Sequence, residues 1–455
     1  MLSNSSKTKQ QNLFYSPLSD MLDMNDPLIA LSNAIDWEIF ENEFSQFYSK
    51  DGSPAKPIRL MVGLLILKQL ENLSDESIVI QWKRNPYYQY FCGYNEMQLC
   101  EPCHSTQLVK FRQRIGKEGM ELIFKVSVQL HGNKAEEKEV LIDTTVQEKN
   151  ITYPTDGKLA IKMIHHLHKI GKKEQLNLRR TFVKEIKEHR INLRFFKHPK
   201  KIKKARSSIK RLRTIVGILI RDISRNLKQD KLSNYTNTFD LFDKVRNQQI
   251  KDSNKVLSLH ESHVYAITKG KDHKKYEYGT KASIVATKDS GVIVGVASHS
   301  KNEHDSKTLE AALISANKTR TTAIKEVICD RGYRGIKEVL GTIISIPGTT
   351  LKKDTEYQKQ QKRDKFKRRA AIEPIIGHLK SDFRLARNYL KGFIGDQINL
   401  LLAATAWNLK KWINLYFFAL FNGEIKLLIE SVSQIKLYYQ IFLQLIVIKL
   451  IFTHP

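Results

Sequence analysis

Apolar and polar residues are spaced differently in the first part of the chain than in the rest. From about residue 26 to residue 120, apolar residues recur at steps of three and four, the spacing of one face of a helix. Asp26 and Pro27 are suited to be the N-cap and first residue of one such helix, and Ser74 is suited to cap another. We therefore expect a flexible segment over residues 1–25, followed by an all-helical domain over residues 26–125.

Three stretches give this helical region its expected detail. Residues 58–73 are apolar on every side, which predicts a buried helix. Residues 85–95 are aromatic and suggest a turn. Residues 104–116 predict a helix that carries Lys110, Arg112 and Arg114 on a mostly solvated face. A recognition helix for a DNA groove and a plain packing or dimerisation domain fit these residues equally well.

Short apolar runs typical of strands begin near Glu139. The run over residues 139–147 predicts the first strand, and residues 149–156 its hairpin partner or a neighbouring strand. Two apolar runs around the turn residues 288–291 predict a hairpin. Further strands are expected over 327–330 and 342–349, then a helix over about 362–380 and another from Gly395. The order predicts a mixed α/β core.

Residues 158–255 interrupt this core with a helical and very basic insertion. The segment contains 28 Lys and Arg residues against 8 Asp and Glu, so it contributes +20 of the formal net charge of +29. A charged run is usually a solvated helical face, but the predominance of one sign favours contact with phosphates. One side of a long helix is marked by apolar residues at steps of three and four: Ile209, Leu212, Val216, Leu219, Ile223 and Leu227.

Composition narrows the partner and the compartment. The chain of 455 residues is long enough for two or three domains, and its 76 Lys and Arg against 47 Asp and Glu indicate a polyanionic partner such as nucleic acid. The four cysteines and the polar N-terminus predict a cytoplasmic protein. The longest uncharged run of the apolar extension, residues 419–455, is too short to cross a bilayer, so no membrane partner is expected.

Three carboxylates carry the candidate chemistry. Asp143 and Asp330 each close a short apolar run of the buried-strand type, and Glu373 lies in a helical stretch rich in cations. Two strand-end aspartates and a helix glutamate can hold a pair of Mg²⁺ ions, as in enzymes that cut or rejoin phosphodiesters. An isolated aspartate after a strand is more often a turn or a helix cap. The joint presence of the three residues favours the metal site.

The surroundings of Glu373 follow a regular spacing. Arg369 precedes it by one helical turn, Lys380 follows it by two, and Phe366 lies one turn before Arg369. Cations on the same face as a metal-binding glutamate could place a phosphate beside the metals. The alternative is a surface salt bridge, worth only a few tenths of a kcal/mol (~0.3), which leaves the aromatic residue and the lysine unexplained. Pro374 could kink the helix and displace Lys380.

These blocks resemble the DDE transposases of bacterial insertion sequences, in particular the insertion-sequence-four and -five groups. The similar blocks are IDTTVQEKNITYPTD, CDRGYRG and IEPIIGHLKSDFRLARNYLKG, together with LSDESIVIQWKRNPYYQYFCGYN for the N-terminal helical domain. The resemblance spans roughly residues 12–415. It implies a ribonuclease-H-like mixed sheet flanked by helices, in which Asp143, Asp330 and Glu373 are the catalytic and metal-binding residues.

The resemblance also implies DNA-binding residues. The Tyr-x2-Arg-x3-Glu-x6-Lys signature of the family maps onto Phe366, Arg369, Glu373 and Lys380. Phenylalanine replaces the tyrosine, so the hydroxyl is lost while stacking on a base or ribose is retained. Arg369 and Lys380 are expected to bind transposon-end DNA, and the other DNA-binding candidates are Phe366 and, in the basic insertion, Arg211 and Arg213.

The expected protein cuts the ends of an insertion sequence and transfers the strands to new DNA. Residues 26–125 would bind the DNA ends, and residues 136–157 and 256–418 would form the catalytic core around the insertion. Two Mg²⁺ ions, replaceable by Mn²⁺, would act on double-stranded DNA, namely terminal inverted repeats and target DNA, in a homodimer at the bacterial nucleoid. Two alternatives stay open: a decayed or domesticated transposase that only binds DNA, and a metal-dependent DNA nuclease that does not transfer strands.

Overall fold

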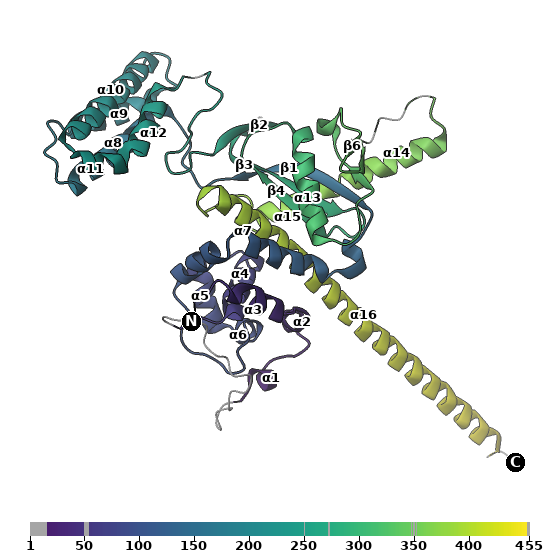
Figure 1. Ribbon diagram of the computed structural model, residues 1–455. Helices are drawn as coiled ribbons and strands as arrows, with labels where there is room; N and C mark the ends of the chain where they lie inside the picture. The colour runs from purple at the N-terminus through teal and green to yellow at the C-terminus, as the bar shows by residue number, and fades with distance from the viewer. Residues whose placement is uncertain are drawn as a thin grey trace.

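The computed structural model describes the backbone of residues 16–49, 54–249, 251–271, 274–346, 348, 351 and 353–452. Within these ranges it describes the side chains of all residues except 269–271, 274, 366 and 423–452. The chain forms a helical N-terminal unit, a mixed α/β core and a helical insertion that projects from the core (Figure 1). The predicted fold class, mixed α/β with helical N-terminal and inserted parts, is confirmed.

Local capping starts the helices of the N-terminal unit where the sequence predicted. Asp26 accepts a hydrogen bond of 2.7 Å from the backbone N–H of Leu28, and Ser74 accepts one of 3.0 Å from that of Ser77. The aromatic stretch predicted as a turn is a helix capped by Asn85, so that prediction was wrong. The helices are α1 Leu18–Met21, α2 Pro27–Ala34, α3 Glu38–Ser45, α4 Ile58–Leu70, α5 Asp75–Arg84, α6 Pro86–Phe91 and α7 Ser105–Gln129.

A buried ion cluster joins three helices of this unit. Asp75, at the start of α5, accepts from Lys68 of α4 at 2.9 Å and from Arg112 of α7 at 2.9 and 2.5 Å. The expectation that Arg112 lies on a solvated face was wrong, because its side chain is only 5% exposed and is held by this carboxylate. One carboxylate therefore pairs with two cations where α4, α5 and α7 meet.

We expect the stability of this unit to fall as the pH drops from about 4 to about 2. Burial raises the pKa of Asp75, but Arg112 and Lys68 outweigh it and lower the pKa from 3.8 to about 2. Because the folded pKa is depressed, the stabilisation is present above the unfolded pKa and is lost as Asp75 takes up its proton. The shift corresponds to about 2 kcal/mol. The unfolding free energy can be followed against pH by the fluorescence of the buried Trp82.

Asp75→Asn is the comparison for that experiment. The variant removes the titrating group, so its stability should vary less with pH than that of the wild type between pH 4 and pH 2. An acid profile identical to that of the wild type would show that Asp75 does not titrate in this window.

The core is built on a seven-stranded mixed sheet. Its order is β2-β3-β1-β5-β7-β6, with β4 also paired to β3, and β1, β5 and β7 are parallel while β3 runs antiparallel to β1. The predicted hairpin is confirmed as β3 and β4. The expected strand after β1 was wrong, because residues 150–155 contain no strand. The strands are β1 Glu139–Glu148, β2 Tyr265–Lys271, β3 Lys274–Thr287, β4 Ile293–His299, β5 Glu326–Ile328, β6 Glu338–Val339 and β7 Thr342–Ser345.

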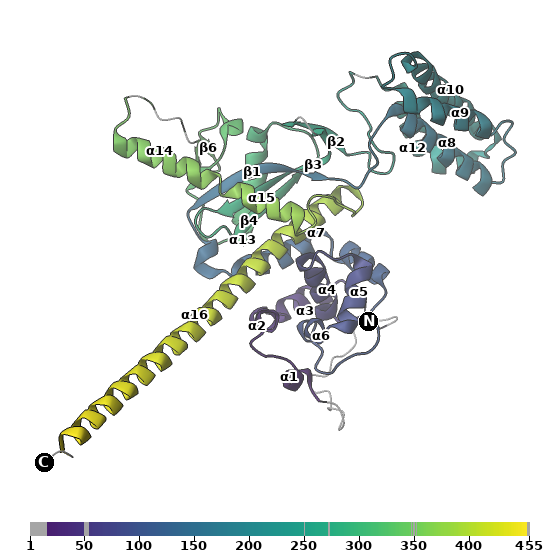
Figure 2. The ribbon, with the colours of Figure 1, turned by 180° about the vertical axis from the view of Figure 1, so that it is seen from behind.

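Helices connect the sheet to the N-terminal unit. α13 packs on β3 and β4, α15 contacts β1, and α16 lies between β4 and the helices α4 and α7 (Figures 1 and 2). The single helix expected over residues 362–380 is two helices, separated at Ala370–Ala371. Among the described residues, no helix has both the length and the apolar character needed to cross a bilayer. The bounds are α13 Leu309–Thr319, α14 Glu356–Arg369, α15 Ile372–Ser381 and α16 Gly392–Phe452.

The insertion folds around a hydrophobic core of its own. The apolar side predicted for its long helix is confirmed, since Leu212, Val216, Leu219 and Ile223 are fully buried. It leaves the core after β1 and returns before β2, and it stands to one side of the sheet (Figures 1 and 2). Its helices are α8 Asp156–Lys173, α9 Val183–Asn192, α10 Ile202–Asn226, α11 Gln229–Leu232 and α12 Thr236–Asn247.

Candidate active site

Asp143 and Asp330 lie at matching positions of neighbouring parallel strands. β1 and β5 pair in parallel up to Leu141 and Ile328, and each aspartate follows its paired residue by two positions. Asp330 comes after the end of β5, as expected. Asp143 does not end its strand, because β1 continues to Glu148 beside β3. It lies where the parallel pairing of β1 ends, so the two aspartates are still close, since paired strands are about 4.8 Å apart.

A third carboxylate, Asp305, joins them from the short turn Asp305–Thr308 before α13. A Cβ atom built at Gly332 would lie 2.9 Å from Oδ1 of Asp330 and 3.1 Å from Oδ2 of Asp305. These two oxygens are therefore no farther apart than the sum of the two distances. The backbone N–H of Gly332 also donates to Oδ1 of Asp330 at 2.8 Å. A glycine thus makes room for two carboxylates from different turns.

Two buried groups next to these carboxylates have a raised pKa, in part because of the nearby negative charge. Burial, followed by the charges of Asp330 and Asp143, raises the pKa of the Cys329 thiol to about 12. Burial, followed by the charges of Asp143 and Asp305, likewise raises the pKa of the Tyr333 hydroxyl. Both groups are therefore held protonated near neutral pH. Asp143 therefore lies near both buried groups, Asp330 near Cys329 and Asp305 near Tyr333.

Lys281 and Thr144 hold Asp305 in place. The ammonium of Lys281 donates to Oδ1 of Asp305 at 2.8 Å and to the carbonyl oxygen of Glu303 at 2.6 Å. The hydroxyl of Thr144, next to Asp143, donates to the same Oδ1 at 2.9 Å. One oxygen of Asp305 is thus bonded to the strands β1 and β3, while its Oδ2 lies toward Asp330.

Sequence reasoning missed both Asp305 and Lys281. The signal for Asp305 was the one used for Asp330, an acidic residue soon after an apolar strand. The signal for Lys281 was a charged residue inside the apolar run of β3, where it is only 9% exposed. A buried lysine of this kind needs a carboxylate partner.

Glu373 is brought to the same end of the sheet by its neighbour. Ile372 is buried against Leu141 and Ile328, the residues two positions before Asp143 and Asp330. The carboxylate of Glu373 itself is 61% exposed and accepts from Arg369 at 2.7 Å. The predicted i,i+4 pairing therefore forms, although it spans the break between α14 and α15.

The two remaining residues of the predicted signature lie on either side of Glu373. Lys380 is half-buried on α15. The backbone of Phe366 belongs to α14, and its side chain lies outside the described part of the protein.

The donor set fits a hard divalent cation in its chemistry. The available ligands are the carboxylates of Asp143, Asp305, Asp330 and Glu373, and carboxylate oxygens are the ligands that Mg²⁺ prefers. Their arrangement is open, because no three His, Cys, Asp or Glu side chains among the described residues are grouped closely enough to hold a metal ion. Glu373 would have to exchange Arg369 for the ion. Asp143 and Asp330 each follow the last paired residue of adjacent strands by two positions.

The predicted DNA-binding residues of the insertion are engaged with carboxylates. Arg211 donates to both oxygens of Glu185, and Nη2 of Arg213 donates to Asp156 at 2.8 Å and to the carbonyl oxygen of Gln248 at 3.1 Å. Both side chains remain partly exposed. They lie in the insertion, away from the strands that carry Asp143 and Asp330.

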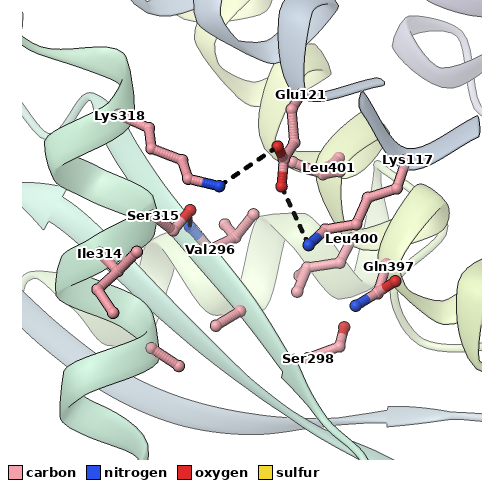
Figure 3. Close-up of a pocket in the computed structure, with 12 residues that line it drawn as sticks. Lys117, Glu121, Val296, Ser298, Ile314, Ser315, Lys318, Gln397, Leu400 and Leu401 are labelled. Carbon is pink, nitrogen blue, oxygen red and sulfur yellow. Dashed lines mark hydrogen bonds and ion pairs between the residues drawn. The ribbon is translucent and has the colours of Figure 1, made fainter. Parts of the chain in front are cut away.

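A separate cavity of about 310 Å³ lies where α7, β4, α13 and α16 meet (Figure 3). Glu121 accepts there from Lys117 at 3.2 Å and from Lys318 at 3.7 Å. None of Asp143, Asp330 and Glu373 lines this cavity. It is a gap between the N-terminal unit and the core, and the predicted chemistry is not located in it.

Two family models match the chain. Residues 16–114 match "Transposase domain (DUF772)", which covers most of the helical N-terminal unit. Residues 252–409 match "Transposase DDE domain", which includes Asp305, Asp330 and Glu373. Asp143 and the helices α8 to α12 of the insertion lie between the two matched segments.

A relative is found in Rhizobium meliloti. The protein "Uncharacterized protein ORF8 in nfe locus" is 36% identical over 194 residues, which cover 42% of this chain and 94% of that protein. No solved structure matches the chain.

Proposed function

Because the chain belongs to the DDE transposases of bacterial insertion sequences, a family of ribonuclease-H-like fold that acts on DNA with divalent metals, we propose that it cuts DNA strands at the ends of such an element and joins them to target DNA. The observation that carries the proposal is the register of β1 and β5, which sets Asp143 and Asp330 side by side. Both reactions are in-line displacements at phosphorus: water attacks first and leaves a 3′-hydroxyl, which then attacks the target strand.

We assign Asp143, Asp330 and Glu373 as the catalytic and metal-binding residues. They would hold two Mg²⁺ ions, or Mn²⁺ in their place, which would lower the pKa of the attacking water or 3′-hydroxyl and stabilise the leaving oxygen. The sheet fixes the backbone of Asp143, while the hydrogen bond from Gly332 fixes the carboxylate of Asp330. Asp305 has one oxygen bonded to Lys281 and Thr144, so its ion pair would lie beside this site.

Arg369 and Lys380 would hold the DNA end beside these carboxylates. Arg369 is paired with Glu373 at 2.7 Å, so an incoming phosphate would compete for Arg369 and would free the carboxylate of Glu373 to help hold a metal ion. This exchange would couple binding of the DNA end to completion of the acidic site. Phe366 would stack on a base or ribose of the same end.

The other parts would position double-stranded DNA. The N-terminal helices would bind the terminal inverted repeats, and the basic insertion, with Arg211 and Arg213, would bind the phosphate backbone. Two ends have to be joined, so the acting species would be a homodimer on DNA in the bacterial nucleoid.

A joining assay tests the proposal. The purified chain would be incubated with Mg²⁺, a DNA fragment that carries the ends of its own element, and a supercoiled target plasmid. We expect cut ends together with covalently joined end–target products. Cut ends without joined products would indicate the nuclease alternative, and binding without any cutting would indicate the non-enzymatic one. Both results would contradict the proposed strand transfer.

A further inference from the structure

A basic hollow of about 470 Å³ lies on the insertion, along one side of α10. Four of its cations lie on α10, at residues 206, 210, 213 and 221. They are separated by four, three and eight residues, so they form a stripe about 22 Å long. Arg246 reaches the same hollow from the end of α12. No acidic residue lines the hollow, whose cations are Arg206, Lys210, Arg213, Arg221 and Arg246.

Most of these cations have no carboxylate partner. Among the described residues, no Asp or Glu lies within ion-pair distance of Arg206, Lys210 or Arg221, and all three are exposed. Arg213 and Arg246 are paired, with Asp156 at 2.8 Å and with Asp243 at 2.9 Å, through carboxylates outside the hollow. The hollow therefore keeps a positive charge that the protein itself does not neutralise.

Two guanidinium groups meet at Gly217, in the centre of the stripe. A Cβ atom at this position would lie 2.2 Å from Nη1 of Arg246 and 3.6 Å from Nη1 of Arg221. The two nitrogens are therefore no farther apart than the sum of these distances. The Nε atom of Arg246 is buried without a hydrogen-bond partner. Gly217 lets the side chain of Arg246 lie against α10, and any larger residue would displace it.

Arg246 is paired with Asp243, but Arg221 lacks a carboxylate partner among the described residues, so an anion placed between the two guanidinium groups would be attracted by both. An oxyanion with several acceptor oxygens suits adjacent guanidinium groups, which donate in a fork. The length of the stripe suits a series of phosphates better than a single one, because each DNA strand carries a phosphate about every 3.4 Å along the helix axis. Charge and spacing both favour a nucleic-acid backbone.

We propose that this hollow is a phosphate-binding site for the backbone of double-stranded DNA, centred on Arg221 and Arg246 over Gly217. The site deepens the proposed function and rests on it, since DNA is the ligand. The site recognises phosphates and no base sequence, so it would add affinity equally at element ends and at target DNA. Arg211 is tied to Glu185 on another side of α10 and does not line the hollow.

The test is the salt dependence of binding to a DNA duplex of arbitrary sequence, measured in EDTA so that no strand is cut. The double variant Arg221→Gln/Arg246→Gln should bind roughly tenfold more weakly and lower the slope of log K against log [salt] by about two. Gly217→Ala should lower the slope by about one although the net charge is unchanged, because it displaces Arg246.

Lys318→Gln is the control. It removes one positive charge from an exposed position near the end of α13, outside the insertion and the hollow, and should keep the wild-type slope. Thermal unfolding midpoints of all variants show whether each is folded. A folded double variant with the wild-type slope, or an equal loss in Lys318→Gln, would overturn the phosphate site. Mg²⁺-dependent cutting by the wild type, measured in parallel, tests the proposed function separately.

Discussion

Replacing Asp143 or Asp330 by asparagine, or Glu373 by glutamine, should reduce strand cleavage by at least about 1,000-fold while leaving DNA binding largely intact. Each change removes one negative charge and keeps the volume of the side chain. In the proposed function the carboxylates serve the chemistry, whereas binding to DNA depends on the cations. Cleavage of labelled element ends in Mg²⁺, beside binding in EDTA, measures the two effects.

Glu310→Gln is the control for these variants. Glu310 is an exposed residue in the first turn of α13, and its loss should leave cleavage at the wild-type rate. Normal cleavage by all three catalytic variants would end the assignment. If only the two aspartate variants lost cleavage, Asp143 and Asp330 would keep their catalytic assignment and Glu373 would lose it. Glu373 forms an ion pair with Arg369 in this structure.

Replacing Lys149 by methionine should destabilise the protein by about 3–5 kcal/mol. Lys149 is 2% exposed, and its ammonium lies 2.5 Å from Asp396 and 3.4 Å from Glu261, which are 1% and 3% exposed. Without the lysine, two carboxylates would remain buried together. The imidazole of His263 shares a hydrogen bond of 2.9 Å with Asp396, and the side chain of His263 is 22% exposed.

This cluster joins both ends of the insertion to α16. Lys149 follows β1, Glu261 precedes β2, and Asp396 is in the first turns of α16. We therefore expect Lys149→Met to lower the thermal unfolding midpoint and to speed proteolysis at the two junctions of the insertion. Lys318→Met, which removes an exposed ion pair, should cost at most about 1 kcal/mol. Equal effects of the two substitutions would contradict a stabilising role for the buried cluster.

Adding Glu261→Gln and Asp396→Asn to Lys149→Met should restore part of the lost stability, because the neutral side chains need no buried counter-charge. Asp396 also accepts a hydrogen bond of 2.6 Å from the side-chain amide of Asn388. A triple variant less stable than Lys149→Met would mean that losing such hydrogen bonds costs more than removing the buried charges gains.

Local features of the sequence determined much of the fold. The caps at Asp26 and Ser74, the apolar side of α10 and the hairpin of β3 and β4 depend on residues near one another along the chain, and all were predicted. The motifs around Asp330 and Glu373 carried the family resemblance in the same way. Apolar periodicity, turn residues and motif spacing are properties of a short segment, so the sequence alone reveals them.

Only the tertiary structure decided which distant charges meet. It buried Arg112 against Asp75, placed Asp305 beside Asp330, and set Arg246 next to Arg221 over Gly217. It also continued β1 past Asp143, because β3, more than 100 residues later in the chain, pairs with it. Such contacts depend on how strands and helices pack, and a buried charge reaches its partner only through that packing. The chain by itself names the acidic residues; the fold selects which of them share a site.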